Sequence, residues 1–309
     1  MFDRILIPLD GSAFSESCLP FAEAIPCRRV LLLYVEPPES RERGELGLSP
    51  HGALTYLERH AQRFRARGLE VERVVDYGDP AERIVDMASE AQLIVLARHA
   101  GAAGSHPFYG DYADRVARHA PAPALLVRGD DHAMPPAGFA RIVVPLDGSP
   151  AAEEALPFAR LMANSLSLPI HLVRVEPPKL ADQGSVNTSA EIERYFRLLL
   201  LRLDTGMPVR WEARQGDAAL ELLAHIAPTD LVAMTIQGEG GSHRWRLGTV
   251  AARIVRQAPA PVLLVRDSLQ SRSSLAFTES TGETGTGLSE WWQPEGFDAS
   301  HYGEPLPIG

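Results

Sequence analysis

The segment RILIPLDGS at residues 4–12 returns almost unchanged as RIVVPLDGS at residues 141–149. Three further pairs of segments keep nearly the same spacing: VEPP at 35–38 and 175–178, GD at 78–79 and 216–217, and APAPALLVR at 120–128 with APAPVLLVR at 258–266. A near-constant shift over four separate segments indicates that one unit of the chain has been duplicated. We call residues 1–128 the first copy and residues 139–267 the second copy.

Each copy alternates short apolar runs with amphipathic segments, and this pattern predicts an α/β fold. In the first copy the predicted strands are 5–8, 29–35, 70–76, 93–97 and 124–127, and the predicted helices lie near 14–25, 54–67, 80–90 and 111–119. The strands are apolar at nearly every residue, which is typical of parallel strands covered on both faces. Five strands alternating with four helices predict a doubly wound parallel sheet. Pro20 and Pro157 fall within the first predicted helix of each copy and predict a kink there.

The copies are joined by a polar, proline-rich linker over 129–138, and an acidic tail over 268–309 follows the second copy. Since the linker is short, we expect the copies to form an intrachain pseudo-twofold pair, joined through the apolar edges of their last strands. The tail is rich in Ser, Thr and Gly and is expected to be largely irregular. Its adjacent Trp291 and Trp292 leave two alternatives open, a docking segment or a solvated extension.

The 309 residues are 45% hydrophobic and 23% charged, with a formal net charge of −10. The sequence lacks the basic stripe that is typical of nucleic-acid-binding proteins, so no nucleic acid is expected as a partner. No apolar run reaches the roughly 18 residues that a membrane helix needs, and no membrane association is expected. The first residues lack the apolar core of a signal peptide, which favours the cytoplasm.

A glycine-rich loop lies within TIQGEGGSHRWRLGT at residues 235–249. It follows an apolar run and precedes a helical segment, and this order of elements brings backbone N–H groups and a helix N-terminus together as an anion site. Arg244 and Arg246 would add charge-assisted hydrogen bonds to phosphate oxygens. The alternative is an ordinary α/β loop with surface arginines.

Both copies resemble the universal stress protein family over residues 1–266. The resemblance rests on the PLDGS segments, the Gly-Asp pairs, the Ala-Pro-Ala-Pro runs and, above all, the glycine-rich loop. ATP-binding members of that family have the pattern G-2x-G-9x-G-[S/T]. Here Gly238 is followed by nine residues and then by Gly248 and Thr249, whereas Thr235 stands where the pattern has its first glycine.

The resemblance implies that each copy is a Rossmann-like domain with five strands in the order 3-2-1-4-5. Nucleotide would then lie at the carboxyl ends of strands one and four, where the strand order reverses. It implies ATP as the ligand, with a divalent ion such as Mg²⁺. Asp147 would contact the nucleoside, Val175 would line the adenine pocket, and the loop would hold the phosphates. The expected nucleotide-binding residues are Pro145, Asp147, Val175, Met234, Thr235, Gly238, Arg244, Arg246, Gly248, Thr249 and Val250.

The first copy keeps the spacing of this loop but not its chemistry. Ala100 replaces Gly238, Asp111 replaces Thr249, and His106 and Phe108 replace the two arginines. A carboxylate at position 111 would cap the helix itself and repel a phosphate. We therefore predict that only the second copy binds ATP in the family's manner.

Two functions remain open from the sequence. One is a stress-response protein that binds ATP and acts by regulation; the other is a nucleotide-free scaffold, favoured by Thr235 and by Glu239 within the loop. His99, His106, His119 and His243 form no recognisable catalytic set or metal-ligand spacing, so at most slow ATP hydrolysis is expected and no metal ligand is assigned. An unidentified protein partner is expected, and self-association beyond the internal pair is left open.

Overall fold

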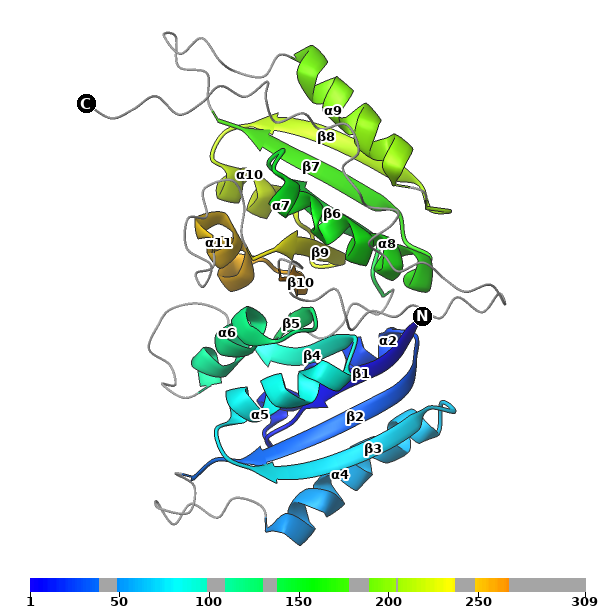
Figure 1. Ribbon diagram of the computed structural model, residues 1–309, viewed down its shortest axis with the longest axis vertical. Helices are drawn as coiled ribbons and strands as arrows, with labels where there is room; N and C mark the ends of the chain where they lie inside the picture. Colours follow the sequence, from blue (N-terminus) through cyan, green and yellow to red (C-terminus); the bar gives the residue numbers. More distant parts are fainter. Residues whose placement is uncertain are drawn as a thin grey trace, which may run out of the picture. The chain divides into compact units, whose positions relative to one another are not determined.

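The computed structural model describes residues 1–38, 49–98, 109–129, 138–177, 189–203, 205–236 and 248–266, which belong to one compact unit over Met1–Ser274 (Figure 1). The tail from 268 onward, with Trp291 and Trp292, lies outside the described residues. Most of the linker also lies outside the described residues. The same holds for these residues of the loops between the fourth strand and the last helix of each copy: Ala100, His106, Phe108, Gly238, Arg244 and Arg246.

The elements of the first copy are β1 (Phe2–Pro8), α1 (Ala13–Glu16), α2 (Leu19–Ala24), β2 (Cys27–Glu36), α4 (Pro50–Arg65), β3 (Glu70–Tyr77), α5 (Pro80–Met87), the short 3-10 helix η1 (Ala88–Glu90), β4 (Leu93–Arg98), α6 (Tyr109–His119) and β5 (Ala124–Arg128). Those of the second copy are β6 (Arg141–Leu146), α7 (Pro150–Glu153), α8 (Ala155–Leu166), β7 (Ile170–Glu176), α9 (Ser189–Arg202), β8 (Val209–Gln215), α10 (Ala218–His225), β9 (Asp230–Thr235), α11 (Thr249–Gln257) and β10 (Val262–Val265).

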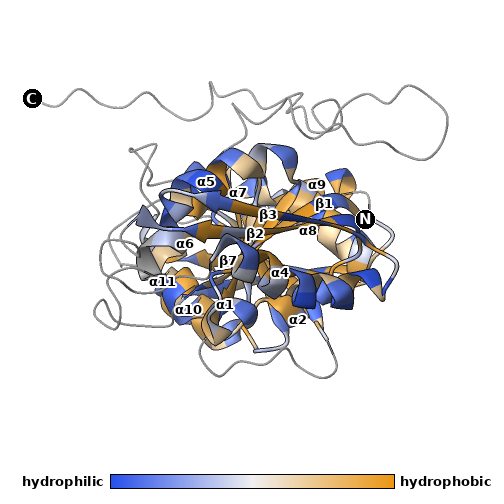
Figure 2. Ribbon diagram, turned by 90° about the horizontal axis from the view of Figure 1, so that it is seen from below, coloured by the Kyte–Doolittle hydropathy of each residue, from blue (hydrophilic) through white to orange (hydrophobic). Residues whose placement is uncertain are grey.

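The ten strands form one sheet in the order β3-β2-β1-β4-β5-β10-β9-β6-β7-β8. Each copy thus contributes five strands in the order 3-2-1-4-5, and the strands within a copy are parallel. Helices α4 and α5 lie on opposite faces of the first copy's strands, as do α9 and α10 in the second copy (Figure 2). The expected fold class, two tandem doubly wound α/β domains, is confirmed.

The two copies meet through their last strands. β5 and β10 pair antiparallel, with Leu125 opposite Leu263 at the centre of the pairing. Two side chains also reach across: the Arg98 Nη2 donates to the carbonyl oxygen of Ala258 and the Arg266 Nη1 to that of His119, both at 3.0 Å. Each copy therefore covers a strand edge that would otherwise be open.

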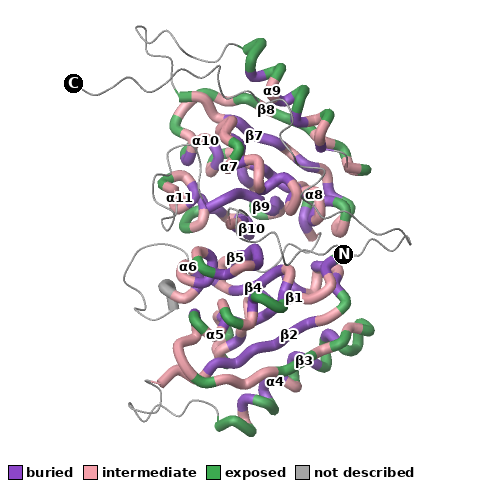
Figure 3. Tube along the Cα trace, viewed as in Figure 1, coloured by how far each residue is buried: buried purple, intermediate pink, exposed green. Residues whose placement is uncertain are grey.

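The core follows the central strands. Figure 3 shows buried residues along the inner strands, while exposed residues gather on outer faces such as those of α4 and α9. Ile5, Leu6 and Ile7 of β1 are all fully buried, as a strand covered on both faces requires. One cluster of buried apolar residues extends from the first copy into the second and includes Leu126 of β5 and Val262 of β10. Among the described helices, none is both long enough and apolar enough to span a membrane.

The two prolines do not lie inside a continuous helix, so the predicted kink is replaced by a break. α1 ends at Glu16 and a new helix, α2, begins at Leu19, so that Pro20 lies in its first turn. In the second copy α8 begins at Ala155, and Pro157 is its third residue. A proline in the first turn removes no helical hydrogen bond, because that N–H has no acceptor within the helix.

Candidate functional site

The carboxyl ends of β6 and β9 separate where the strand order reverses. β6 pairs with β7 as far as Leu146, but its pairing with β9 ends at Val143, opposite Val232. β9 instead continues along β10 as far as Thr235. The last three residues of β6 are therefore unpaired on the β9 side, and an open edge begins at this switch point.

Pro145 helps to separate the two strands. The N–H of Ile142 donates to Pro169 on the β7 side at 2.9 Å. Because successive N–H groups of a strand point to alternate neighbours, the N–H that Pro145 lacks is one on the β9 side. Pro8 occupies the equivalent position in the first copy. There the N–H of Leu9 donates to Leu33 of β2 at 2.8 Å, so the N–H that Pro8 lacks is one on the β4 side.

A tight turn follows β6 and fixes Asp147. Its Oδ1 accepts hydrogen bonds from the backbone N–H and the Oγ of Ser149, at 2.9 and 2.6 Å. The Ser149 Oγ then caps α7 by accepting from the N–H of Ala152 at 3.2 Å. Gly148 has φ +92°, and a Cβ there would lie 2.7 Å from the Arg174 Nη1, so the turn requires glycine. The half-buried Asp147 is thus held at the open edge.

Arg174 lies beneath this turn. It is 9% exposed, its Nε donates to the Glu176 Oε1 at 2.5 Å, and its guanidinium lies 5.1 Å from the ring centre of Tyr195. Burial and the nearby Glu153 raise the pKa of Tyr195, and burial raises the pKa of Glu153. Arg174 was not among the site residues predicted from the sequence. An alignment of the two copies would have identified it, because Arg174 corresponds to Tyr34 in the first copy. The fold therefore does not require a charged residue at this position.

The start of α11 lies against the end of β9, although a loop separates them in the sequence. The N–H of Gly248 donates to the carbonyl of Ile236 at 2.9 Å, and the N–H of Ile236 donates to Val265 at 3.0 Å. Gly248 is the N-cap, with φ −56° and ψ 152°, and a Cβ there would make only an ordinary contact, 3.5 Å from the Ile236 oxygen. Neither the backbone conformation nor crowding by the described residues therefore demands glycine at this position.

No side chain caps the start of α11. Among the other described α-helices the same holds for α2 and α8, but these follow closely on α1 and α7 and their N-cap residues are already helical. Side-chain caps are supplied elsewhere by Ser12, Ser49, Asp79, Ser149 and Asp217. In α11 the exposed Thr249 and the half-buried Val250 follow the N-cap. Uncapped first-turn N–H groups and the positive end of the helix dipole suit an anion.

The remaining expected residues are placed as follows. Pro145 and Val175 are half-buried near the carboxyl ends of β6 and β7. Met234 and Thr235, at the end of β9, are only 6% and 7% exposed. The structure thus brings the described members of the expected set to one edge of the sheet, with Met234 and Thr235 buried beneath it. Their contacts with a nucleotide remain predictions.

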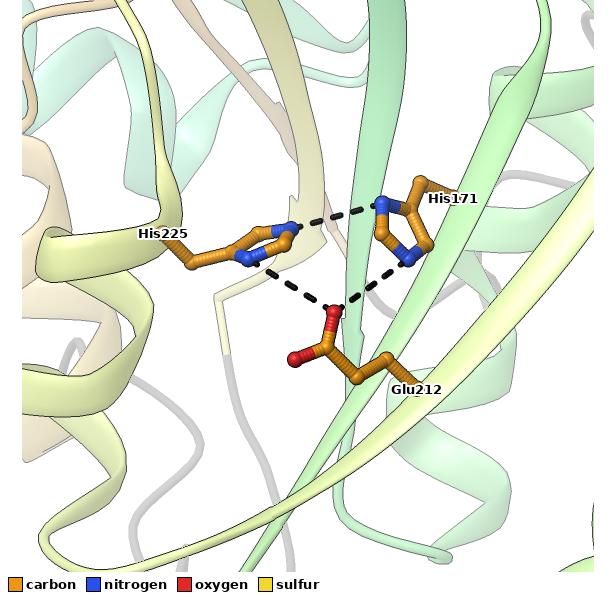
Figure 4. Close-up of side chains that lie close together, drawn as sticks. All are labelled: His171, Glu212 and His225. Atoms are coloured by element: carbon orange, nitrogen blue, oxygen red, sulfur yellow. Dashed lines mark hydrogen bonds and ion pairs between the residues drawn. The ribbon is translucent and has the colours of Figure 1, made fainter.

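A second group of polar side chains lies toward the amino ends of the second copy's strands (Figure 4). His171 of β7, Glu212 of β8 and His225, the last residue of α10, point toward one another, and each offers a ligand atom within 4.8 Å of the other two. This group was not predicted from the sequence because its members lie far apart in the chain. An alignment of the copies would have found it, since their counterparts are Leu31, Val74 and Met87.

Comparison with known proteins agrees with this architecture. A universal stress protein of Mycobacterium tuberculosis is 26% identical over 220 residues, covering 65% of this chain and 71% of the relative. One of Methanocaldococcus jannaschii is 29% identical over 140 residues, covering 41% and 82%. The crystal structure of a universal stress protein from Archaeoglobus fulgidus matches with a TM-score of 0.63 at 19% identity, covering 85% of this chain and 98% of that one. The family model named "Universal stress protein family" matches residues 1–128 and again 138–266. The chain therefore belongs to the universal stress protein family.

Proposed function

We propose that this protein is a cytoplasmic regulatory protein whose second copy binds ATP and whose first copy does not. The observation that supports this most is the uncapped start of α11, which is held at the end of β9 beside the open edge of β6. A helix N-terminus at a topological switch point favours the negative charge of a phosphate chain.

The expected residues would share the ligand as follows. The N–H groups of Thr249 and Val250 would donate to phosphate oxygens, and the Thr249 hydroxyl would add a further donor. Asp147 would accept from a ribose hydroxyl, and Val175 would pack against adenine. Pro145, Met234 and Thr235 would form the floor, Gly238, Arg244 and Arg246 would close the loop over the phosphates, and Mg²⁺ would bind phosphate oxygens.

Regulation rather than catalysis is proposed because α11 connects this edge to the contact between the copies. Ala251 and Ile254 of α11 belong to the shared core, and Ala258, just after the helix, accepts the hydrogen bond from Arg98 of the first copy. β10 then pairs with β5. A ligand that orders the start of α11 would therefore act on the helix and strand that touch the first copy, and a protein partner would sense that change.

The test compares two glycines at equivalent positions. ATP binding to the purified full-length protein is measured by calorimetry, with and without Mg²⁺, after the absorbance at 260 nm has been checked for nucleotide retained from expression. Gly248→Glu should weaken binding by at least about tenfold, because its carboxylate lies at the phosphate position. The control is Gly110→Glu, since Gly110 lies within α6 in the first copy, and it should leave binding unchanged.

A wild-type protein that binds no ATP would refute the proposal and favour the nucleotide-free scaffold. Equal binding by wild type and Gly248→Glu would show that ATP binds elsewhere. If Gly110→Glu loses ATP binding and Gly248→Glu does not, the nucleotide binds to the first copy and the proposal is wrong.

A further inference from the structure

We propose that His171, Glu212 and His225 form a binding site for a divalent transition-metal ion of the zinc class. The site lies toward the amino ends of the second copy's strands, whereas the proposed nucleotide edge lies at the carboxyl ends. It therefore does not depend on the proposed ATP site.

The backbone brings the three side chains to one face of the sheet. Val173 of β7 is paired with Glu212 of β8, so Glu212 lies on the same face as His171, two residues before Val173. His225 is contributed by the end of α10, the helix over this face. The ligands thus come from three separate elements whose positions are fixed by the fold.

One ligand atom from each of the three residues lies within 4.8 Å of the other two (Figure 4). The His225 Nε2 and the His171 Nδ1 are 3.3 Å apart. The Glu212 Oε2 lies 3.7 Å from the His171 Nε2 and 3.8 Å from the His225 Nδ1. Ligand atoms about 2.1 Å from a tetrahedral zinc ion are roughly 3.4 Å from one another. The three contacts use both nitrogens of each histidine, so the side chains must rotate to direct one atom of each residue at a common ion, with a fourth position left for water.

The first copy shows that the fold itself does not require these groups. At the equivalent positions it has Leu31, Val74 and Met87, which all pack in or against the hydrophobic core. Replacing three apolar side chains by two imidazoles and a carboxylate lowers stability unless the polar groups are satisfied. All three positions differ together, and they provide the two nitrogen ligands and one oxygen ligand of an open zinc site.

Metal binding requires the neutral form of both histidines. Burial, followed by the charge of Arg141, lowers the pKa of both His171 and His225. The Arg141 Nη1 donates to the His171 Nδ1 at 2.7 Å, since arginine has no acceptor. A metal ion on Nδ1 of His171 replaces this hydrogen bond directly. A metal ion on Nε2 leaves the single proton of the neutral ring on Nδ1, which then cannot accept from Arg141. Arg141 keeps its two hydrogen bonds to Asp230, at 2.9 and 3.1 Å, when it withdraws.

The test is a titration of the metal-free, full-length protein with Co²⁺, followed by displacement with Zn²⁺. Wild type should bind one equivalent and develop the visible absorption of a four- or five-coordinate Co²⁺ site, which Zn²⁺ then removes. The triple variant His171→Leu, Glu212→Val, His225→Met carries the first copy's residues. It should lose the absorption and at least about a hundredfold in affinity, because even changes outside the ligand set cost ten- to a hundredfold.

Two further variants keep the result interpretable. His225→Gln removes one ligand with little change in volume and should also weaken binding, whether or not the triple variant folds. His51→Gln alters an exposed histidine of α4 and should bind like wild type. Absence of stoichiometric binding by wild type overturns the proposal. Unchanged binding by His225→Gln or by a folded triple variant also overturns it, because the ion would then lie elsewhere.

Discussion

The two copies share a scaffold and differ at the places where chemistry is expected. Asp10 makes the same two hydrogen bonds to Ser12, at 2.9 and 2.6 Å, that Asp147 makes in the second copy. The last helix of each copy is tied to the preceding one by equivalent ion pairs, Arg115–Asp79 at 2.8 Å and Arg253–Asp217 at 2.9 Å. These shared contacts set the turn after the first strand and the position of α6 or α11.

The differences lie at both ends of the strands. At the carboxyl edge, α6 already begins at Tyr109, so that Gly110, the counterpart of the N-cap Gly248, lies inside the helix. Toward the amino ends, the apolar packing of the first copy gives way to the histidine–glutamate group. The first copy therefore shows which residues the fold needs, and the second copy shows which residues have been added to it.

The largest effect is expected from the buried ion pair that only the second copy has. Asp230 is 1% exposed and its carboxylate binds Arg141 and the N–H of Ala227, the last at 2.8 Å. Asp230→Ala should lower the free energy of unfolding by about 3 kcal/mol, because it leaves a guanidinium without its partner. At the same position of the first copy, Gln92→Ala removes one hydrogen bond, from the N–H of Asp3, and should cost about 1 kcal/mol. Urea unfolding followed by circular dichroism measures both, and equal losses would contradict this account.

The sequence predicted the strands well because runs of buried residues leave a direct record in composition. The segment predicted at 29–35 is β2, Cys27–Glu36, and the segment predicted at 93–97 is β4, Leu93–Arg98. The strand order came from the family resemblance, since pairing partners are set by tertiary packing. The break before Pro20 was not predicted because it depends on a local turn at Ser17, whose N–H and Oγ both donate to the carbonyl oxygen of Phe14.

The candidate nucleotide residues were found because strand ends and glycines mark a switch point in the sequence itself. The histidine–glutamate group and Arg174 were missed for the opposite reason. Single polar residues such as His171 within strands carry no local pattern, and their proximity arises only when β7, β8 and α10 pack together. Comparison of the two copies position by position supplies the missing signal.

The turn after the first strand provides a second test of the comparison. Gly11 and Gly148 both have positive φ, 89° and 92°, so alanine at either should cost about 1–2 kcal/mol. Gly148→Ala should cost more, because its Cβ would also displace the buried Arg174, whose counterpart in the first copy is Tyr34. Unfolding midpoints of the two variants give the difference. A larger loss for Gly11→Ala would show that Arg174 moves aside freely.

A third test places the first copy's residue at the start of α11. Thr249→Asp should weaken ATP binding by about tenfold or more, since a carboxylate about 4 Å from a phosphate costs roughly 1–4 kcal/mol between water and a protein surface. The change should not destabilise the fold, because an acid in the first turn of a helix interacts favourably with its dipole. Calorimetry gives the affinity, and thermal unfolding gives the stability.

The reverse change, Asp111→Thr, should create no site, because α6 begins two residues before Asp111. ATP binding that appears in the first copy would contradict this view of the two helix starts.

The smallest effect is expected from pH. Burial and Arg141 lower the pKa of His171 and His225 in the folded protein, while Glu212 and Asp230 act in the opposite direction and Arg214 further lowers that of His225. Below the ordinary histidine pKa of about 6.5, the unfolded chain therefore binds protons before the folded one does. Stability that is fully present above this value should fall as the pH drops toward the lowered folded pKa.

His60 of the first copy also has a lowered pKa and contributes to the same fall. The test is therefore the difference between wild type and the variant with Leu, Val and Met at positions 171, 212 and 225. Acidification should destabilise wild type more than this variant, and equal pH dependence would mean that the two histidines take up protons as easily in the folded protein as in the unfolded chain.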